Sequence, residues 1–333
     1  MTAWQLLDRA FGAGGIIAYH GVGDSPHSPV MHISPTRLRA QLEHLRQRYS
    51  VVPLRDLVER WQRGISTRGC VAITFDDAYA GIAVHALPIL RELDLPATVF
   101  VTSDHAAIGA TFWWDDVELE RLAHAAGPWS VGPGVVGLPP FAVADESAMD
   151  GMRTRVLARF AGRWPRALAT KSDTLWRSLD FQELSALGKD DHIDFGVHTL
   201  SHPALPLLSY PEQVSEIRNN FQLLRSRLPR VQQVVAYPYG LYDDTTVRAA
   251  IDAGMVAGLT MEGRATADQP DTMRAPRIGG ADVRTPHSLA RRLNRALRPA
   301  LILRNRGRHP RMPDEHPPMR PGLPNVTPAA RLR

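Results

Sequence analysis

The sequence predicts an α/β fold in which strand and helix units repeat around a parallel sheet that closes, or nearly closes, into a barrel. Two observations lead to this prediction. Short apolar runs alternate with longer amphipathic segments over the first 283 residues, as they do in repeated strand and helix units. Polar side chains follow directly on several of these runs, and parallel barrels carry their functional groups at the carboxyl ends of the strands.

Six short apolar runs are the predicted strands: Gly15–His20, Val71–Phe75, Ala97–Val101, Ile193–His198, Val234–Tyr237 and Met255–Thr260. Between them, Thr36–Arg48 and Pro211–Leu228 place apolar residues at helical intervals, so both are predicted helices. Six or seven such units fit the barrel.

Two regions depart from this alternation. Residues 111–180 combine the cluster Phe112-Trp113-Trp114 with a Gly- and Pro-rich stretch, so we expect an insertion at one rim of a barrel that spans residues 1–283. Residues 284–304 are predicted to form a last helix. Residues 305–333 are rich in Pro and Arg, and we expect disorder there because so little apolar surface cannot offset the entropy of ordering.

Charge and cysteine content exclude several classes of function. Residues 284–333 carry 12 Arg and two acidic residues against a net charge of +5 for the chain, so the body is mildly acidic and no nucleic-acid partner is expected. The single cysteine excludes a disulfide framework and a cysteine-based zinc site within one chain.

The sequence shows neither a secretory signal nor an apolar stretch of about 18 residues that could span a membrane. We therefore expect a cytoplasmic protein that at most attaches to a membrane surface. The oligomeric state is left open.

Two adjacent carboxylates, Asp76 and Asp77, follow the predicted strand Val71–Phe75. Like charges side by side raise the pKa of one carboxyl unless a cation lies between them, and a divalent metal would supply that cation. The alternative is a helix cap, because an aspartate before a helix, here about Gly81–Leu93, is favoured by capping and by the helix dipole. For a lone Asp pair, the cap is the better interpretation.

His198 and His202 follow the strand at Ile193, and two imidazoles four residues apart can bind one metal ion. In a chain with 13 histidines such pairs also arise by chance, so two surface histidines in a loop are the alternative. Joined to an aspartate from another strand end, the pair makes a His₂Asp set with a position open for water, which is typical of catalytic sites. Zinc is the default metal, with cobalt, nickel or manganese as replacements.

Three motifs in this order resemble the polysaccharide deacetylases of the NodB-homology type, carbohydrate esterase family four: Thr74-Phe75-Asp76-Asp77, His198-Thr199-x-x-His202 and Tyr237-Pro238-Tyr239-Gly240. The resemblance covers roughly residues 15–280. It implies an irregular (β/α) barrel of about seven units that hydrolyses N-acetyl groups. It further implies Asp76 as the general base, the backbone N–H of Tyr239 as a donor to the oxyanion, and as metal ligands Asp77, His198 and His202.

The resemblance also implies a histidine that protonates the departing amine, but the usual Leu-x-x-His-like motif is missing after Gly240. Tyr19-His20 resembles the opening of the circularly permuted deacetylases that act on poly-N-acetylglucosamine. His20 is therefore the candidate acid, with a buried structural histidine as the alternative.

Two positions depart from the family pattern. Ala78 stands where a glycine usually follows the Asp pair, so the backbone there must tolerate a Cβ. Ala236 stands where an arginine usually orients the base. Arg277 or Arg274 could reach Asp76 from a later strand, and an exposed loop arginine is the alternative.

Aromatic residues are the main candidates for contact with a sugar. Trp113 and Trp114 could stack on a sugar ring or anchor the insertion to the barrel. Tyr79, Tyr237 and Arg277 complete the set of predicted substrate-binding residues.

The sequence thus predicts a metal-dependent carbohydrate N-deacetylase acting on an amino-sugar polysaccharide or its precursor. Two alternatives stay open. The same site could serve an O-acetyl esterase or a small-amide hydrolase, or the chain could be a catalytically silent carbohydrate-binding barrel. Binding of nucleic acid by the tail would require a salt-dependent affinity that is lost on deletion of residues 305–333.

Overall fold

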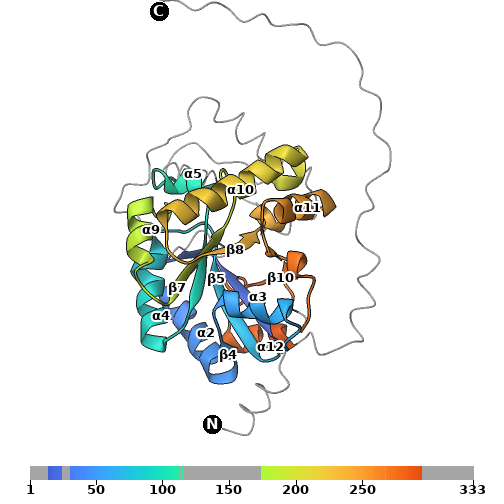
Figure 1. The fold of residues 1–333 in the computed structure, drawn as a ribbon. Coiled ribbons are helices and arrows are strands. Elements are labelled where there is room, and N and C mark those ends of the chain that lie inside the picture. Colours follow the sequence, from blue (N-terminus) through green and yellow to red (C-terminus); the bar gives the residue numbers. More distant parts are fainter. Residues whose placement is uncertain (1–13, 25–30, 113, 116–173, 267, 295–333) are drawn as a thin grey trace, which may run out of the picture. The chain divides into compact units, whose positions relative to one another are not determined.

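The structure is a computed structural model that describes residues 14–24, 31–112, 114–115, 174–266 and 268–294. In these residues, a parallel sheet curls into a nearly closed barrel with helices around it (Figure 1). The predicted α/β barrel is confirmed. Its strands are β1 (Gly15–Tyr19), β4 (Ser50–Val51), β5 (Cys70–Phe75), β6 (Ala97–Val101), β7 (Ile193–Val197), β8 (Val231–Ala236), β9 (Ala257–Thr260), β10 (Ala275–Pro276) and β11 (Ile278–Gly279).

The strands pair in the order β10-β9-β8-β7-β6-β5-β1-β11, and β4 adds to β5 outside this path. β10 pairs with β9 and β11 pairs with β1, yet only Arg277 separates β10 from β11 in the chain. The chain thus passes from one edge of the sheet to the other at this residue. The Arg277 side chain is 0% exposed, so the point of closure also buries a charge.

Capping residues and apolar faces explain where the helices form. The described helices are α2 (Pro35–Arg48), α3 (Leu54–Gln62), α4 (Leu87–Leu93), α5 (Ser103–Ala106), α9 (Phe181–Leu187), α10 (Tyr210–Arg227), α11 (Asp244–Asp252) and α12 (Pro286–Asn294). The side chain of Ser34 accepts a hydrogen bond at the start of α2, and the buried Leu38 and Leu42 lie on one face of this helix. A capping box of Ser209 and Glu212 begins α10. Both predicted helices are confirmed to within one residue.

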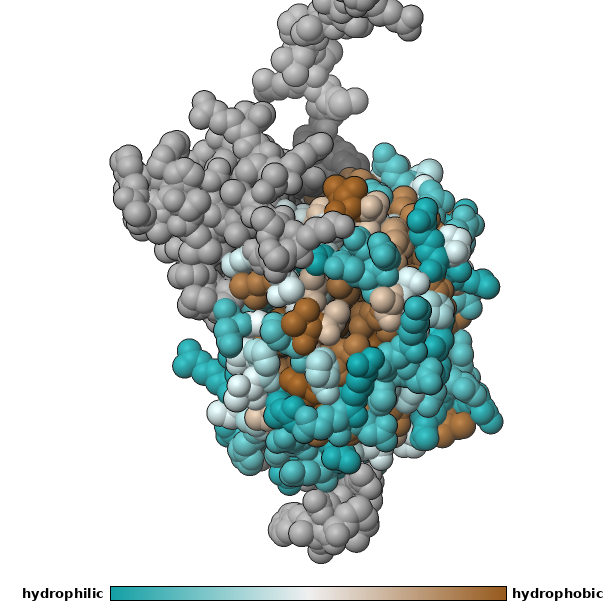
Figure 2. Space-filling view, turned by 90° about the vertical axis from the view of Figure 1, so that its left-hand side faces the viewer, coloured by the Kyte–Doolittle hydropathy of each residue, from teal (hydrophilic) through white to brown (hydrophobic). Residues whose placement is uncertain are grey.

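Alternation along the strands decides what fills the barrel. Ile16, Ala72 and Phe100 share a buried cluster with α3, whereas Ile17 packs in the cluster that includes α2 and α4. Gly196 makes room for Phe100, because a Cβ there would lie 2.3 Å from the ring. Toward the carboxyl ends of the strands, the inward positions change from apolar to polar. Viewed from the side of α4 and α9, the outer surface is mostly hydrophilic, with apolar residues exposed near its middle (Figure 2).

Three features of the fold differ from the sequence prediction or were not part of it. The predicted helix Gly81–Leu93 begins as a π-helix, Ile82–Ala86, and continues as α4. A small second sheet pairs β2 (Gly21–Val22) with β3 (His32–Ile33). The two-residue strands β4, β10 and β11 are too short for a hydrophobic period to reveal them.

The two ends of the predicted insertion lie together. Ser178 N–H donates to Ala110 O, and Leu179 N–H donates to Ala78 O in the loop after β5. The segment therefore leaves and rejoins the barrel beside the Asp pair. Residues 116–173 and the predicted disordered tail lie outside the described residues, and so does the predicted helix beyond Asn294. Among the helices that the structure describes, none is long and apolar enough to cross a membrane.

Candidate active site

The carboxyl ends of the strands surround a cavity of about 130 Å³. It is lined by Ala18, His20, Met31, Asp76, Asp77, Trp114, His198, His202, Tyr237, Tyr239, Gly240, Met261, Gly279, Ala281 and Asp282. Pockets that enclose a whole drug-sized ligand measure roughly 300–1,000 Å³. The cavity therefore suits one substituent of a ligand whose remainder stays outside.

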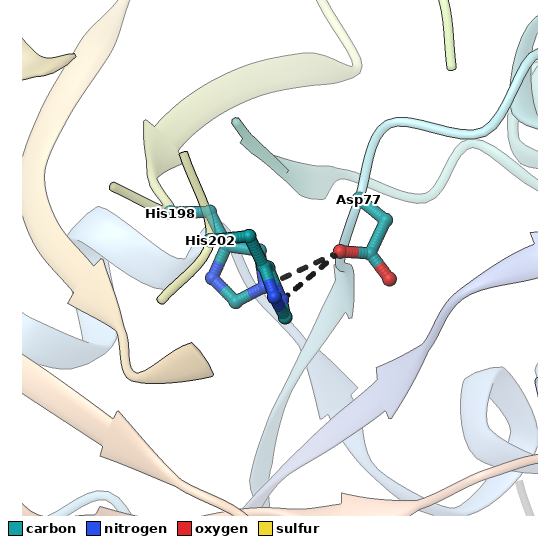
Figure 3. A group of neighbouring side chains, drawn as sticks. All are labelled: Asp77, His198 and His202. Atoms are coloured by element: carbon teal, nitrogen blue, oxygen red, sulfur yellow. Dashed lines mark ion pairs between the residues drawn. The ribbon is translucent and has the colours of Figure 1, made fainter. Parts of the chain in front are cut away.

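Asp77, His198 and His202 direct one ligand atom each toward a common point (Figure 3). The Nε2 atoms of both histidines lie 3.5 Å from Oδ1 of Asp77. A tetrahedral ion with bonds of about 2.1 Å separates its ligand atoms by roughly 3.4 Å, so the spacing fits a metal such as zinc. Within the described part of the chain, Oδ1 of Asp77 is buried without a hydrogen-bond partner, which is unfavourable for a carboxylate unless a cation meets it.

The electrostatics of the three side chains also suit a cation. Burial alone would raise the pKa of Asp77, but its contact with His198 holds that pKa below its ordinary value. Burial lowers the pKa of His202 to about 3, so its ring is neutral at pH 7 and offers a lone pair. Burial opposes charge on His198 as well, yet the neighbouring carboxylates raise its pKa, which shows that this point of the cavity attracts positive charge.

Asp76 points into the same cavity and is held by Arg277. Nη1 and Nη2 of Arg277 donate to Oδ1 and Oδ2 of Asp76, each over 2.7 Å. Burial would raise the pKa of Asp76, but the guanidinium holds it well below its ordinary range. The carboxylate is therefore ionised and fixed in orientation.

This pair resolves the departure at Ala236. Arg277, at the closure of the barrel, supplies the guanidinium that the third motif lacks. Arg274 pairs with Asp271 and Asp244 on the surface instead. The carbonyl of Ala236 accepts a hydrogen bond of 2.7 Å from Nδ1 of His198, which leaves Nε2 of that ring facing Asp77.

Backbone strain is concentrated at this site. Five of the seven non-glycine residues with positive φ in the described part of the chain lie here: Asp77, Ala78, Thr199, His202 and Tyr239. Ala78 has φ 50°, so the backbone does adopt the conformation that favours the usual glycine. Such residues persist only where the surrounding contacts over-determine them.

His20 directly follows β1 and lines the cavity. Its Nε2 is 3.9 Å from Oδ2 of Asp76, and its side chain is 20% exposed. It therefore lies beside Asp76 and is partly exposed.

The polysaccharide deacetylase family matches the sequence over residues 63–132 and 160–258, just over half of the chain. The chain belongs to this family. The match includes the Asp pair, both histidines of the metal-binding set and Tyr239, so the residues that meet in the cavity are also those on which the family resemblance rests. Family members are hydrolases of carbon–nitrogen bonds.

Similar proteins agree with this membership. The chain is 23% identical over 225 residues to poly-β-1,6-N-acetyl-D-glucosamine N-deacetylase of Staphylococcus epidermidis, covering 68% of this chain and 59% of that relative. Streptococcus pyogenes deacetylase PplD superposes with a TM-score of 0.58 at 18% identity, covering 84% of this chain and 98% of that one. IcaB from Ammonifex degensii superposes with a TM-score of 0.55 at 18% identity, covering 85% of this chain and 97% of that one. At these identities, the two structures establish the shared fold.

The predicted sugar-binding aromatics of this family member occupy different positions. Trp114 lines the cavity but is only 7% exposed, and it packs edge-on against His202. Tyr79 is fully buried and donates a hydrogen bond to Asp115, so it supports the site from behind. Tyr237 is also fully buried, and its hydroxyl donates to Met273 O. Trp113 lies outside the described residues.

The sequence analysis missed several residues at the site. Phe112 and His105 stack behind the metal-binding set, and Asp282 and Met261 line the cavity opening. Phe112 had a signal, since it begins the aromatic cluster that includes Trp114. Asp282 had none, because a carboxylate in a Gly- and Ala-rich loop carries no characteristic spacing.

Proposed function

We propose that the chain is a metal-dependent N-deacetylase that removes acetyl groups from an amino-sugar polysaccharide or its precursor. The observation that carries this proposal is the meeting of three ligand atoms with an oriented carboxylate in one cavity. Asp77, His198 and His202 converge, and the Arg277-bound Asp76 lies beside them. An ordinary carbohydrate-binding site has no need for an ionised, buried carboxylate next to a metal-binding set.

Asp77, His198 and His202 would hold the metal, with zinc as the default and cobalt, nickel or manganese as replacements. A bound divalent ion would polarise the acetamide carbonyl and lower the pKa of a water molecule from 15.7 toward about 7. Three protein ligands leave room for that water, as catalytic sites require.

Asp76 is the proposed general base, because Arg277 keeps it ionised and fixes its orientation. His20, which also lines the cavity, is the proposed acid that protonates the departing amine. Tyr239 lines the cavity with φ 59°, and its backbone N–H is the proposed donor to the oxygen that becomes negatively charged.

A polymeric substrate is favoured by two observations. The cavity accommodates one substituent, which suits an acetamido group whose sugar chain lies across the opening. The Staphylococcus epidermidis relative is named for poly-β-1,6-N-acetyl-D-glucosamine, although the chain spans only 59% of that protein. We propose N-acetylglucosamine polymers or their precursors as the substrate class.

The decisive experiment replaces Asp76 by Asn and measures acetate release from N-acetylglucosamine oligomers in the presence of Zn²⁺. Loss of a proton acceptor should lower kcat by about 10²–10⁴-fold while Zn²⁺ still binds. Asp191→Asn, at a side chain that is 97% exposed, is the matched control and should keep full activity.

Three results would contradict parts of the proposal. Release of acetate from O-acetylated xylan but not from the oligomers would indicate an esterase. Binding of oligomers without any release by the wild-type chain would indicate a silent binding module. Full activity of Asp76→Asn would exclude Asp76 as the base.

A further inference from the structure

The two histidines of the metal-binding set are oriented by different means. Nδ1 of His198 donates to the carbonyl of Ala236 over 2.7 Å, the usual arrangement for a metal-binding histidine. Nδ1 of His202 is buried and has no hydrogen-bond partner among the residues that the structure describes. His202 also has φ 60°, a conformation that a non-glycine residue adopts only under constraint. Something other than a hydrogen bond to the ring must therefore hold His202.

Three aromatic rings surround His202. Its ring centroid lies 4.6 Å from Tyr239, 5.1 Å from Trp114 and 5.5 Å from Phe112. The interplanar angles are 81°, 61° and 72°, so every contact is close to edge-to-face, a favourable geometry for aromatic pairs. We call Phe112, Trp114 and Tyr239 the aromatic cage.

The aromatic cage is itself fixed from behind. Phe112 stacks between His105, at 4.0 Å and 11°, and Trp114, at 4.7 Å and 12°. The indole N–H of Trp114 donates to the hydroxyl of Tyr79 over 2.9 Å, and that hydroxyl donates to Asp115 over 2.6 Å. Phe112 and Tyr79 are at most 1% exposed, so these rings have little freedom to turn.

We propose that Phe112 and Trp114 are positioning residues for the metal site, which hold the His202 imidazole in its ligand orientation in place of a hydrogen bond. This inference rests on the proposed metal dependence. It also assigns a role to the start of the predicted insertion, because Phe112 and Trp114 contact a residue of the metal-binding set. A Trp or Phe that merely filled the core would affect stability alone.

The test measures Zn²⁺ affinity of the full chain by calorimetry and the absorption spectrum of its Co²⁺ form. Trp114→Leu and Phe112→Leu should each weaken Zn²⁺ binding by about 10–100-fold, as removal of groups that orient metal-binding histidines does. Both should also alter the Co²⁺ spectrum. Trp114→Phe keeps a ring against His202 and should restore the affinity to within about threefold of the wild type.

Trp61→Leu is the matched control. Trp61 in α3 is 5% exposed, and its indole N–H also donates a hydrogen bond, to Thr67. Neither residue lines the cavity. This variant should lose stability and keep the wild-type Zn²⁺ affinity. Equal affinities in Trp114→Leu, Phe112→Leu and the wild type would overturn the proposal. If Trp114→Leu does not fold, Phe112→Leu alone decides between the two outcomes.

His202→Ala separates this inference from the proposed function. If His202→Ala binds Zn²⁺ as tightly as the wild type, the metal site itself is wrongly assigned. If His202→Ala loses Zn²⁺ while the aromatic-cage variants keep it, the metal site stands and the positioning role is excluded.

Discussion

Buried carboxylates have different partners at the two ends of this barrel. At the carboxyl end, Asp77 is buried with one oxygen lacking a hydrogen-bond partner. At the amino end, Asp190 pairs with Arg91 and His192 near the surface. Asp194 there also has one oxygen without a hydrogen-bond partner among the described residues, but it forms ion pairs with Arg55 and Arg230. Carboxylates at the amino end are neutralised within the chain, whereas the metal-binding set leaves a charge for a ligand to neutralise.

Backbone conformation follows the same division. Of the seven non-glycine residues with positive φ that the structure describes, five lie at the carboxyl end, and the other two, Asp94 and Arg230, lie at the amino end. The carboxyl end therefore contains strained backbone and buried charge that favour chemistry at the cost of stability. Substitutions of the charged residues at the carboxyl end should therefore lower activity, whereas those at the amino end should lower stability alone.

The largest effect is expected from Arg277→Met. It leaves Asp76 buried without its partner, which should lower the free energy of unfolding by about 3–5 kcal/mol. The pKa of Asp76 should rise, so the acidic limb of the kcat/KM pH profile should move to higher pH. Urea denaturation and the pH profile check the two effects.

The double variant Arg277→Met/Asp76→Asn sharpens this result. Removing both charges should recover most of the lost stability without restoring activity. A double variant that is as unstable as the single one would show that packing around Arg277, rather than its charge, carries the effect.

The second prediction concerns the metal. Zn²⁺ at a hundred times its dissociation constant should raise the free energy of unfolding by about 2.7 kcal/mol, because it binds the folded chain alone. Chelation should reverse the gain, and His202→Ala should abolish it. An equal gain in His202→Ala would place the stabilising ion elsewhere.

The sequence predicted the barrel because its longer strands and helices have clear periods, such as Ala97–Val101, whose bounds the structure matches. It could not predict β10 and β11, two residues each, although they close the sheet. Their existence depends on pairing with β9 and β1, which are distant along the chain. A local sequence pattern does not show which distant strands will pair.

The same limit applies to the site. Asp76, Asp77, His198 and His202 were predictable because each follows a recognisable strand within a motif. The aromatic cage and the choice of Arg277 over Arg274 were not, because they depend on which side chains point inward at the barrel closure. The sequence shows the type of each residue, but it does not show whether its side chain points into the barrel.

The third prediction tests the amino end. Burial would raise the pKa of Asp190, but hydrogen bonds from His192 and Arg91 lower it to about 2. Asp190→Asn should therefore lower the free energy of unfolding by about 1–2 kcal/mol at pH 7, with activity unchanged. Since the folded-state pKa is depressed, this stabilisation exists above the unfolded value near 4 and fades as the pH falls toward 2. A loss of stability that is constant from pH 7 to 3 would contradict this origin.

The smallest effect is expected at Ala78, a residue at the carboxyl end whose side-chain methyl group is strained because its backbone is left-handed. Ala78→Gly removes about 1–2 kcal/mol of strain, which should offset the lost methyl burial and the added chain entropy, so stability should stay within about 0.5 kcal/mol of the wild type. Ala80→Gly is the matched control: Ala80 is equally buried, at 1% exposed, but it does not have positive φ. It gains no relief of strain and should lose about 1–2 kcal/mol in urea denaturation. Equal losses in the two variants would mean that the loop after β5 relaxes around Ala78, and the strain assigned to this end of the barrel would be overestimated there.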